Sequence, residues 1–250
     1  MITALRPRIV GHRGACGHAP ENTLASIAKA AELGAEWVEF DCMLTADGVP
    51  VLFHDDKLKR TTGRHGMMSE TPHATLSMLD AGSWFSPAFA GEPVPSLEAA
   101  LGLIGSLGLG GNPEIKPCKG FDRETGEVVA RTVARHWPGH LPPPVLSSYS
   151  ITALKAARAA APHIDRSLIF RPIPGNWRRL VAEVGAVAVH CQGAHLTAAQ
   201  VDQVKAAALT LWVFTVNDAA RALQLFAWGV DAVITDYPDR IAAAVGPPQG

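Results

Sequence analysis

The chain has 250 residues, of which 48% are hydrophobic and 18% are charged. This balance is typical of globular proteins, and it excludes an intrinsically disordered chain, a collagen-like fibre and a coiled coil. With 22 lysines and arginines against 23 acidic residues, the formal net charge is −1, so no chain-wide field favours nucleic acid or an anionic membrane as a partner. We therefore expect a single domain over residues 1–250, in which a local cluster of charges holds any anionic ligand.

The cysteines and the N-terminal residues indicate where the protein works. Cys16, Cys42, Cys118 and Cys191 lie far apart in the sequence and form no Cys-x-x-Cys pair, which is typical of reduced thiols. The first ten residues lack the apolar core of a secretory signal, and no apolar run approaches the roughly 18 residues of a membrane span. These features predict a cytoplasmic protein.

Short β-branched runs alternate with alanine- and leucine-rich stretches of helical periodicity along the chain. We expect strands at residues 8–10, 37–41, 49–53, 112–116, 145–146, 167–170, 187–189, 211–216 and 232–234. Gly34 and Gly229 each follow a helical stretch, where a left-handed residue ends a helix. The alternation predicts a TIM (β/α)8 barrel of the α/β class, because about eight such units fit this length. A doubly wound open sheet is the alternative, but no Gly-x-Gly-x-x-Gly motif follows the first strand.

The segment at about residues 55–95 interrupts this alternation. It is rich in Gly, Ser, Pro, Thr and His and shows no sustained periodicity. We therefore expect it to be an insertion that lies over the strand ends.

Acidic side chains on the predicted strands are the first candidate site residues. In residues 37–41 the two-residue period of a strand places Glu39 and Asp41 on one face. Residues 112–116 repeat this arrangement with Glu114 and Lys116. Both faces of a parallel strand are buried, so carboxylates there need a compensating cation or proton, whereas an exposed antiparallel strand would need neither. Three carboxylates make an oxygen-only site that suits Mg²⁺ or Ca²⁺ better than Zn²⁺.

Histidine and basic side chains also follow the predicted strands. His12 and Arg13 come directly after the first strand, and His54 follows the apolar run that ends at residue 53. Together with Lys116, Arg13 brings positive charge that suits an anionic phosphoryl oxygen. Two histidines beside such a site can serve as general base and general acid. A lone histidine at a strand end more often binds backbone groups, so this hypothesis depends on the residues occurring together.

In this combination the sequence resembles the glycerophosphodiester phosphodiesterase family, and most closely its cytoplasmic bacterial members. The matching segments are His12-Arg13-Gly14, Pro20-Glu21-Asn22-Thr23, Glu39-x-Asp41, His54-Asp55, Glu114-Ile115-Lys116, Thr215-Val216-Asn217 and residues 229–236. The resemblance runs from about residue 8 to residue 240. It implies a TIM barrel with a small insertion after the second strand. It also implies cleavage of glycerophosphodiesters, such as glycerophosphocholine or glycerophosphoethanolamine, to sn-glycerol 3-phosphate and an alcohol.

The resemblance further implies roles for individual residues, with Mg²⁺ or Ca²⁺ as the cofactor. It assigns acid–base catalysis to His12 and His54, metal binding to Glu39, Asp41 and Glu114, and phosphate contacts to Arg13 and Lys116. In the implied reaction, one histidine deprotonates the glycerol hydroxyl next to the phosphoester, and that oxygen attacks phosphorus to give a cyclic phosphate. The other histidine protonates the departing alcohol, and water then opens the ring. The sequence leaves open which histidine is the base.

Two positions depart from the usual residues of the family. Pro113 stands where an aliphatic residue is usual, and because proline lacks an N–H we expect a bulge or a gap in the sheet that shifts Glu114. Phe214 stands where Trp or Tyr is common, so the apolar wall of the substrate site remains without a polar tip. Ser148 either contacts substrate or caps the next helix.

Three other functions are alternatives. The nearest is a lysophospholipase D-type phosphodiesterase on acylated substrates, which needs an apolar groove or a membrane-facing patch. A metal-dependent amidohydrolase on the same barrel needs His-x-His after the first strand, where His12-Arg13-Gly14 stands instead. A non-catalytic binding barrel would lack at least one of the catalytic histidines or acids, and none is missing.

Overall fold

The computed structural model describes residues 7–246 and contains nine strands, ten α-helices and three short 3-10 helices in that range. The strands are β1 (Ile9–Gly11), β2 (Trp37–Leu44), β3 (Pro50–Leu52), β4 (Gly110–Ile115), β5 (Val145–Ser148), β6 (Asp165–Phe170), β7 (Ala188–Gln192), β8 (Thr210–Phe214) and β9 (Ala232–Thr235). The helices are α1 (Leu24–Glu32), α2 (Lys59–Thr62), α3 (His73–Leu76), α4 (Leu97–Leu107), α5 (Asp122–His136), α6 (Ile151–Ala160), α7 (Trp177–Val184), α8 (Ala198–Lys205), α9 (Ala219–Ala227) and α10 (Pro238–Val245). Each predicted strand corresponds to one of the nine, with ends that differ by a few residues. Among these ten helices, none is long and apolar enough to cross a membrane.

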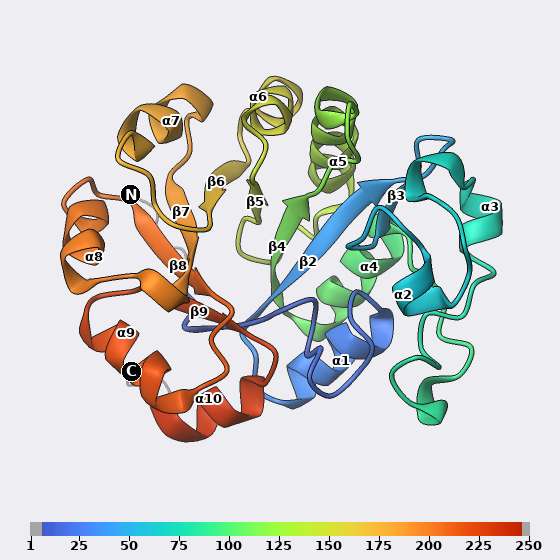
Figure 1. Cartoon of the computed structure of the whole chain (residues 1–250), viewed down its shortest axis with the longest axis horizontal. Coiled ribbons are helices and arrows are strands. Elements are labelled where there is room, and N and C mark those ends of the chain that lie inside the picture. The colour runs from blue at the N-terminus through green and yellow to red at the C-terminus, as the bar shows by residue number, and fades with distance from the viewer. Residues whose placement is uncertain (1–6, 247–250) are drawn as a thin grey trace.

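Eight of the strands form a closed parallel barrel (Figure 1). Around the ring the order is β1-β9-β8-β7-β6-β5-β4-β2, and β2 pairs with β1 to close it. Helices connect successive strands on the outside of the ring, so the predicted TIM barrel is confirmed and the open doubly wound sheet is excluded. β3 lies outside the ring, where it pairs antiparallel with the end of β2 through Leu52 and Cys42.

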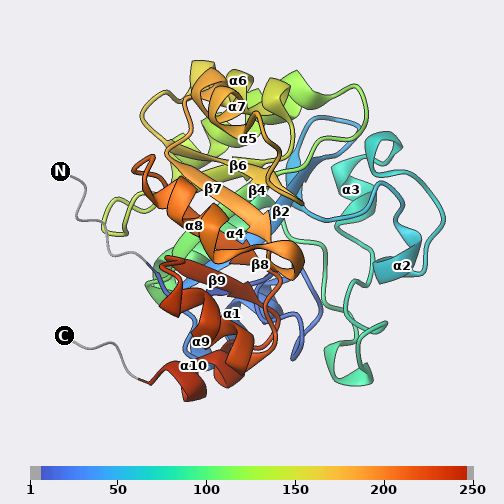
Figure 2. The same ribbon diagram turned by 60° about the vertical axis from the view of Figure 1, so that its left-hand side comes forward.

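Capping residues explain where the helices begin and end. α1 begins after Thr23, whose side chain accepts a hydrogen bond from the Ser26 N–H in a capping box. Gly34 (φ 82°) and Gly229 (φ 96°) take the left-handed conformation after α1 and α9, as predicted, and the chain then enters a strand. The last helix, α10, packs against α9 and the first strand, β1, and completes the outer layer of helices (Figure 2).

Apolar side chains fill the barrel interior toward the amino-terminal ends of the strands. Val10, Trp37, Trp212 and Ile234 belong to one buried cluster, in which the two indole rings meet edge to face with centroids 5.6 Å apart. Inward-facing positions alternate along each strand, so the next inward positions toward the carboxyl ends carry the polar residues of the site. Because the interior is packed toward the amino-terminal ends of the strands, the space for a ligand lies at the carboxyl-terminal mouth of the barrel.

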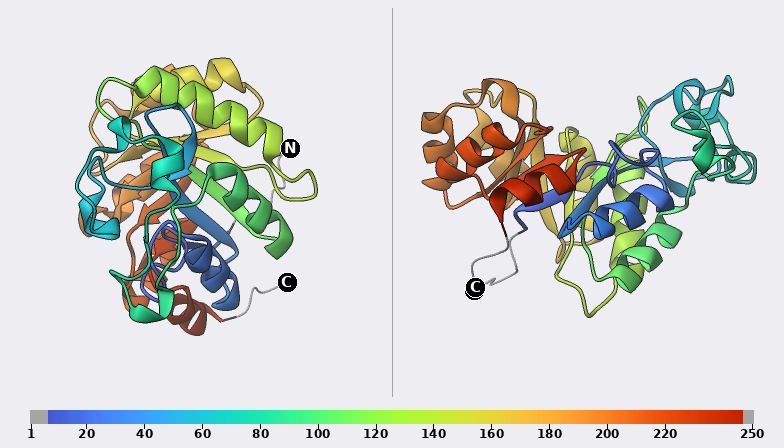
Figure 3. Two further views of the ribbon diagram at one scale, coloured as in Figure 1. Left: turned by 90° about the vertical axis from the view of Figure 1, so that its right-hand side faces the viewer. Right: turned by 90° about the horizontal axis from the view of Figure 1, so that it is seen from below.

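The segment between β3 and α4 is the insertion. It contains α2 and α3 with two short 3-10 helices, η1 (Met68–Glu70) and η2 (Pro87–Phe89), and it projects from the barrel beside β3 (Figures 1 and 3). Its Leu58 and Leu76 are in one buried cluster with Met43 of β2. The insertion is thus anchored on the strand that carries two of the candidate metal ligands. That residues 1–250 form a single domain stays a prediction, because both ends lie outside the described residues.

Candidate active site

The candidate residues converge on one cavity of about 460 Å³ at the carboxyl ends of the barrel strands. Its lining includes His12, Arg13, Glu39, Asp41, His54, Glu114, Lys116 and Phe214. These residues come from the segments after β1, β3 and β4, from β2 and β4 themselves, and from the end of β8. The carboxyl-terminal mouth is where catalytic groups collect in barrels of this kind. The structure therefore brings the whole predicted set together.

Three carboxylates from β2 and β4 form the acidic centre of this cavity. Asp41 lies beside Glu114 in the parallel ladder, and Glu39 lies two residues earlier on the same face of β2. One oxygen atom from each carboxylate lies within 4.8 Å of the other two. Glu39 and Asp41 are only 5% and 2% exposed. Negative charge is therefore concentrated where little water can stabilise it.

Burial and mutual repulsion set the protonation of this acidic cluster. Burial raises the pKa of Glu39 well above its ordinary value, and the charges of Asp41 and Glu114 raise it further. Burial and the charge of Asp41 raise the pKa of Glu114 to about 7. Burial also opposes ionisation of Asp41, but the charges of Arg13 and Lys116 outweigh it and lower the pKa of this carboxyl. The two basic neighbours therefore favour ionisation of Asp41, whereas burial and repulsion oppose full ionisation of Glu39 and Glu114.

The donor set of the acidic cluster fits a hard divalent cation. All three residues offer carboxylate oxygens, which Mg²⁺ and Ca²⁺ prefer, whereas structural zinc sites are built mainly from thiolate and imidazole. A divalent charge would also offset the repulsion that raises the pKa of Glu39. Glu39, Asp41 and Glu114 are therefore the residues that could hold a metal ion in this cavity.

Two basic side chains flank the acidic cluster. Lys116 Nζ lies 3.4 Å from Asp41 Oδ1 and 3.6 Å from Glu114 Oε1. Arg13 Nε lies 3.2 Å from Asp41 Oδ2, and the Arg13 backbone N–H donates to Glu39 Oε2 at 3.0 Å. The side-chain exposures of Arg13 and Lys116 are 18% and 25%, so both cations are only partly hydrated. They are placed to attract an anionic group into the cavity.

The turn between β1 and α1 aims these groups at the acidic cluster. Arg13 (φ 49°) and Asn22 (φ 56°) both adopt the left-handed conformation, which a residue other than glycine takes at a cost in free energy. Gly14 (φ 84°) is required between them, because a Cβ there would lie 2.4 Å from Ser26 Oγ. The Asn22 amide donates to Asp41 Oδ2 at 2.9 Å and accepts from the Asp41 backbone N–H at 3.0 Å. The strained turn is therefore fixed to the carboxylate that it supports.

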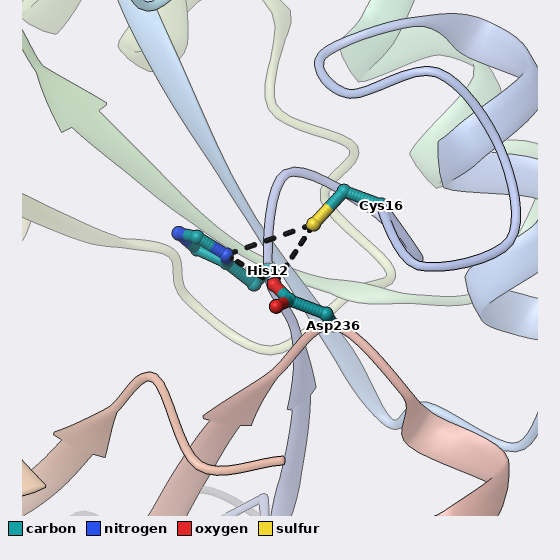
Figure 4. Close-up of side chains that lie close together, drawn as sticks. All are labelled: His12, Cys16 and Asp236. Carbon is teal, nitrogen blue, oxygen red and sulfur yellow. Dashed lines mark hydrogen bonds and ion pairs between the residues drawn. The ribbon is translucent and has the colours of Figure 1, made fainter. Parts of the chain in front are cut away.

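His12 is oriented by a carboxylate from the far end of the chain (Figure 4). Its Nδ1 lies 2.6 Å from Oδ1 of Asp236, the residue after β9. The Cys16 thiol donates to the same oxygen at 2.8 Å, and Asn217 Nδ2 donates to Oδ2 at 2.6 Å. Burial opposes ionisation of Asp236, but these hydrogen bonds lower its pKa, so a carboxylate accepts the Nδ1 proton. The other ring nitrogen points away from this pair and is free to exchange a proton with a ligand.

His12, Cys16 and Asp236 also lie close enough together to hold a metal ion. Their hydrogen bonds instead satisfy one another, as Figure 4 shows. Burial and the adjacent charge of Asp236 raise the pKa of the Cys16 thiol, so it stays protonated and acts as a hydrogen-bond donor. This group is therefore better explained as the support of His12.

His54 is oriented by its neighbour in the sequence. Its Nδ1 lies 2.6 Å from Asp55 Oδ1. Arg60 of α2 donates to both oxygens of Asp55, at 2.6 and 3.0 Å, and to both oxygens of Glu21 at 2.7 Å. Burial lowers the pKa of His54 below its ordinary value, although the charge of Asp41 acts in the opposite direction. Through Arg60 the insertion thus connects the two loops that carry the histidines.

The residues that orient the two histidines were missed by sequence reasoning. Asp236 belongs to the terminal segment that matches the family, but nothing in the sequence connects it to His12, which lies 224 positions away. Arg60 lies in the irregular insertion and belongs to no motif. The adjacent pair His54-Asp55 is the one sequence signal that could have identified an orienting carboxylate.

Pro113 leaves Glu114 in place, contrary to the expected shift. β4 pairs with β2 over its whole length, and the gap falls on the side of β5, where Glu114 and Ser147 form the single registered pair of these two described strands. Asn112 Nδ2 donates to the Val145 carbonyl at 2.5 Å and to Ser147 Oγ at 3.0 Å. This side-chain amide supplies a donor where the proline has none.

Phe214 lies in the cavity wall, with its ring edge to face against Tyr149 at 6.4 Å. Of the two alternatives for Ser148, the cap of α6 was wrong. Its hydroxyl donates to the Ile115 carbonyl at 2.6 Å, and it is not among the residues that line the cavity. The cap of α6 is Ser150 instead.

Two imidazoles that can move protons, beside buried carboxylates and two cations, point to an enzyme that hydrolyses an anionic ester. Comparison with known proteins identifies the family. Residues 12–240 match the model of the glycerophosphoryl diester phosphodiesterase family. The chain belongs to that family, as the resemblance predicted.

Individual relatives agree over nearly the whole chain. A glycerophosphodiester phosphodiesterase of Bacillus subtilis is 30% identical over 251 residues, which cover 92% of this chain and 83% of that protein. One from Caldanaerobacter subterraneus is 28% identical over 238 residues, with 95% and 97% covered. Among solved structures, a phosphodiesterase of Oleispira antarctica in complex with the product sn-glycerol 3-phosphate has a TM-score of 0.93 and 41% identity over 96% of both chains. The protein is therefore a glycerophosphodiester phosphodiesterase, and the amidohydrolase and binding-barrel alternatives are excluded.

Proposed function

We propose that the protein hydrolyses glycerophosphocholine, glycerophosphoethanolamine and similar diesters to sn-glycerol 3-phosphate and an alcohol, with Mg²⁺ or Ca²⁺ and with His12 and His54 as the acid–base pair. One observation carries this proposal: two histidines, each with Nδ1 held by a carboxylate at 2.6 Å, line the same cavity as the acidic cluster. The Oleispira antarctica relative, which holds sn-glycerol 3-phosphate, supports this product.

The acidic cluster of Glu39, Asp41 and Glu114 would hold the divalent ion. When bound, the ion supplies positive charge that polarises substrate oxygens and stabilises the negative charge that develops around phosphorus. Arg13 and Lys116 bind the non-bridging phosphate oxygens from the same side, because their charged ends lie beside Asp41 at the cavity wall. A phosphodiester is thereby held with its phosphorus within reach of both histidines.

The two histidines divide the proton transfers between them. One imidazole takes the proton of the glycerol hydroxyl next to the phosphoester, and the freed oxygen bonds to phosphorus while the bond from phosphorus to the alcohol oxygen breaks. The other imidazole, protonated at the start, gives its proton to the departing alcohol oxygen. Water then adds to phosphorus, and the cyclic phosphate opens to glycerol 3-phosphate as the histidines exchange roles. Asp236 and Asp55 hold the imidazoles by Nδ1 and leave Nε2 for these transfers.

A lysophospholipase D-type activity on acylated substrates is the second candidate. It needs apolar surface around the mouth of the cavity. Within residues 7–246, Tyr149 is the one large exposed apolar side chain that lines the cavity. A surface without an apolar patch at the site favours diesters that carry no acyl chain.

We also propose that the enzyme works in the cytoplasm. All four cysteines are unpaired, and three of them are buried. Unpaired thiols are typical of a reducing compartment. Cell fractionation with antibody detection tests this location, and recovery in the secreted or periplasmic fraction would contradict it.

Release of sn-glycerol 3-phosphate tests the proposed function. Purified protein is given glycerophosphocholine or glycerophosphoethanolamine, first with a chelator and then with excess Mg²⁺ or Ca²⁺, and glycerol 3-phosphate is quantified. We expect release to stop with the chelator and to return with the metal. Undiminished release in the chelator would refute the metal assignment. Cleavage of lysophosphatidylcholine without cleavage of glycerophosphocholine would establish the second candidate.

A further inference from the structure

Among the described residues, five buried side-chain polar atoms have no hydrogen-bond partner, and two of them belong to uncharged side chains that line the cavity. These two atoms are Nε2 of His190 on β7 and Oδ1 of Asn112 on β4. The two side chains are 1% and 0% exposed, and both line the cavity. Buried polar atoms without partners are rare in folded proteins because they are unfavourable. Their presence in a ligand cavity points to a ligand group that completes their hydrogen bonds.

These two atoms lie deeper in the barrel than the phosphate-binding groups. Asn112 precedes Glu114 by two residues on the same face of β4, which places it about 6.6 Å farther along this strand toward its amino-terminal end. It lies beside Glu39 in the ladder. The His190 ring stacks on Trp212 at 4.7 Å between centroids and an interplanar angle of 10°. The Trp212 indole belongs to the apolar cluster of the barrel interior, so the two polar side chains form the floor of the cavity.

The chemistry of this floor, defined by Asn112 and His190, favours a neutral hydroxyl. The Asn112 amide is held with its nitrogen on Val145 and Ser147, so its oxygen remains as an acceptor. Burial lowers the pKa of His190 to about 3, so the imidazole is neutral near pH 7 and carries one donor and one acceptor nitrogen. A hydroxyl can donate to Asn112 and hydrogen-bond His190. An anionic phosphate oxygen would face an acceptor, and a methyl group would leave both atoms unpaired.

The glycerol half of a glycerophosphodiester offers a hydroxyl at the required depth. One glycerol hydroxyl adjoins the phosphoester and reacts. The other terminates the carbon chain five bonds from phosphorus, a reach on the order of 6 Å for bonds near 1.5 Å. The alcohol half differs from one glycerophosphodiester to the next, so it belongs at the open mouth, where Tyr149, Arg171 and Arg221 line the cavity. The constant glycerol half then occupies the closed end.

We propose that Asn112 and His190 bind the terminal hydroxyl of the glycerol half and thereby select glycerol diesters against diesters of propane-1,2-diol. This inference rests on the proposed function and adds a subsite to it, since the reacting hydroxyl and the phosphate are held elsewhere. A site built to hydrogen-bond a hydroxyl discriminates strongly against an analogue without it, because the analogue leaves the buried partners unpaired.

The first test compares two substrates with the wild-type enzyme. One is glycerophosphocholine, and the other is the phosphocholine diester of propane-1,2-diol, which keeps the reacting hydroxyl and lacks only the terminal one. We expect kcat/KM to be at least about 100-fold higher for glycerophosphocholine. Turnover of both diesters at equal kcat/KM would leave the proposed function intact and would refute the proposed role of Asn112 and His190. Absence of turnover with both diesters would refute the proposed function together with the proposed role of Asn112 and His190.

The second test uses the His190→Phe variant, which keeps a ring for stacking on Trp212 and removes the polar atoms. We expect the ratio of the two kcat/KM values to fall at least about tenfold. The matched control is Ile169→Val, because Ile169 pairs with His190 in the ladder and lines the cavity without a polar side chain. Its ratio should stay within about threefold of wild type. The inference is overturned if His190→Phe slows both substrates equally and keeps the ratio.

A stability measurement separates binding from a structural role. His190→Phe removes no hydrogen bond to Nε2, so we expect its Tm to equal or exceed that of wild type in the absence of substrate. A lower Tm together with an unchanged substrate ratio would show that the imidazole serves packing alone and would overturn the inference.

Discussion

Replacing Asp236 with asparagine tests whether this carboxylate sets the protonation of His12. Asp236 accepts at both of its oxygens, from His12 Nδ1 at 2.6 Å and Cys16 Sγ at 2.8 Å on one side and from Asn217 Nδ2 at 2.6 Å on the other. An asparagine offers one acceptor oxygen and one donor nitrogen. On one of the two sides, the new amide nitrogen must therefore meet a group that now donates to Asp236.

The surrounding hydrogen bonds decide which side that is. Asn217 is held in its orientation because its Oδ1 accepts from Thr235 Oγ1 at 3.1 Å and from the backbone N–H of residue 236 at 2.9 Å. Turning this amide over would lose both bonds, so the new nitrogen faces His12. The Nδ1 of His12 must then accept, and its proton moves to Nε2, the atom that the proposed reaction needs free. The wrong tautomer lowers kcat by about 10³- to 10⁴-fold, or roughly 4 to 5.5 kcal/mol in the barrier.

Steady-state kinetics with glycerophosphocholine and saturating Mg²⁺ or Ca²⁺ measure this effect. We expect the loss in kcat with little change in KM, because Asp236 acts on His12 and not on the substrate. Asp239→Asn is the matched control, since Asp239 pairs with His18 at 2.9 Å and neither residue lines the cavity. Its kcat should stay within about twofold of wild type. A kcat for Asp236→Asn within tenfold of wild type, or an equal loss in Asp239→Asn, would refute the reasoning.

Three further outcomes are expected. Glu39→Gln should abolish metal-dependent turnover and weaken Mg²⁺ binding in calorimetry, yet raise the Tm of the metal-free protein, because it removes a carboxyl whose ionisation is opposed by burial and by the charges of Asp41 and Glu114; a lower metal-free Tm would contradict this. Arg60→Ala should lower kcat about tenfold because Asp55 loses two hydrogen bonds. The control Arg64→Ala, at an exposed position, should leave kcat unchanged. An equal kcat for the two variants would show that Asp55 does not need the support of Arg60. The pKa of about 3 for His190 lies below the ordinary value of 6.5, so the unfolded chain takes up the proton first as the pH falls. Between these two values the wild-type protein should therefore lose about 1.4 kcal/mol of unfolding free energy for each pH unit, relative to His190→Phe. Urea unfolding at pH 7 and pH 5 measures this difference, and parallel losses in the two proteins would count against it.

Local rules predicted most of the barrel and the strand face that carries the acidic cluster. The two-residue period of a strand placed Glu39 and Asp41 on one face of one strand and Glu114 on one face of another, and in the structure Glu114 lies beside Asp41. Gly34 and Gly229 marked the helix ends because a left-handed residue there favours glycine. These inferences depend only on a few adjacent residues, which is why they hold without knowledge of the tertiary structure.

Contacts that depend on closure of the ring could not be predicted in this way. Asp236 reaches His12 only because β9 pairs with β1, and the two residues lie 224 positions apart. Arg60 reaches Glu21 from a short helix whose segment has no periodic pattern. The local rule for Pro113 correctly placed a gap in the ladder, but it could not foresee that the side chain of Asn112 would supply a donor in its place.

The most direct test of the proposed reaction is a ³¹P NMR time course of purified protein with glycerophosphocholine, recorded with a chelator and then with Mg²⁺ or Ca²⁺. In the proposed reaction the glycerol hydroxyl attacks phosphorus and the alcohol departs, in the cavity that the histidines and the acidic cluster line. We therefore predict that the diester signal stays constant in the chelator and is replaced by that of sn-glycerol 3-phosphate once metal is added. Appearance of phosphocholine, which requires cleavage on the glycerol side of phosphorus, or a diester signal that persists with metal present, would contradict this account.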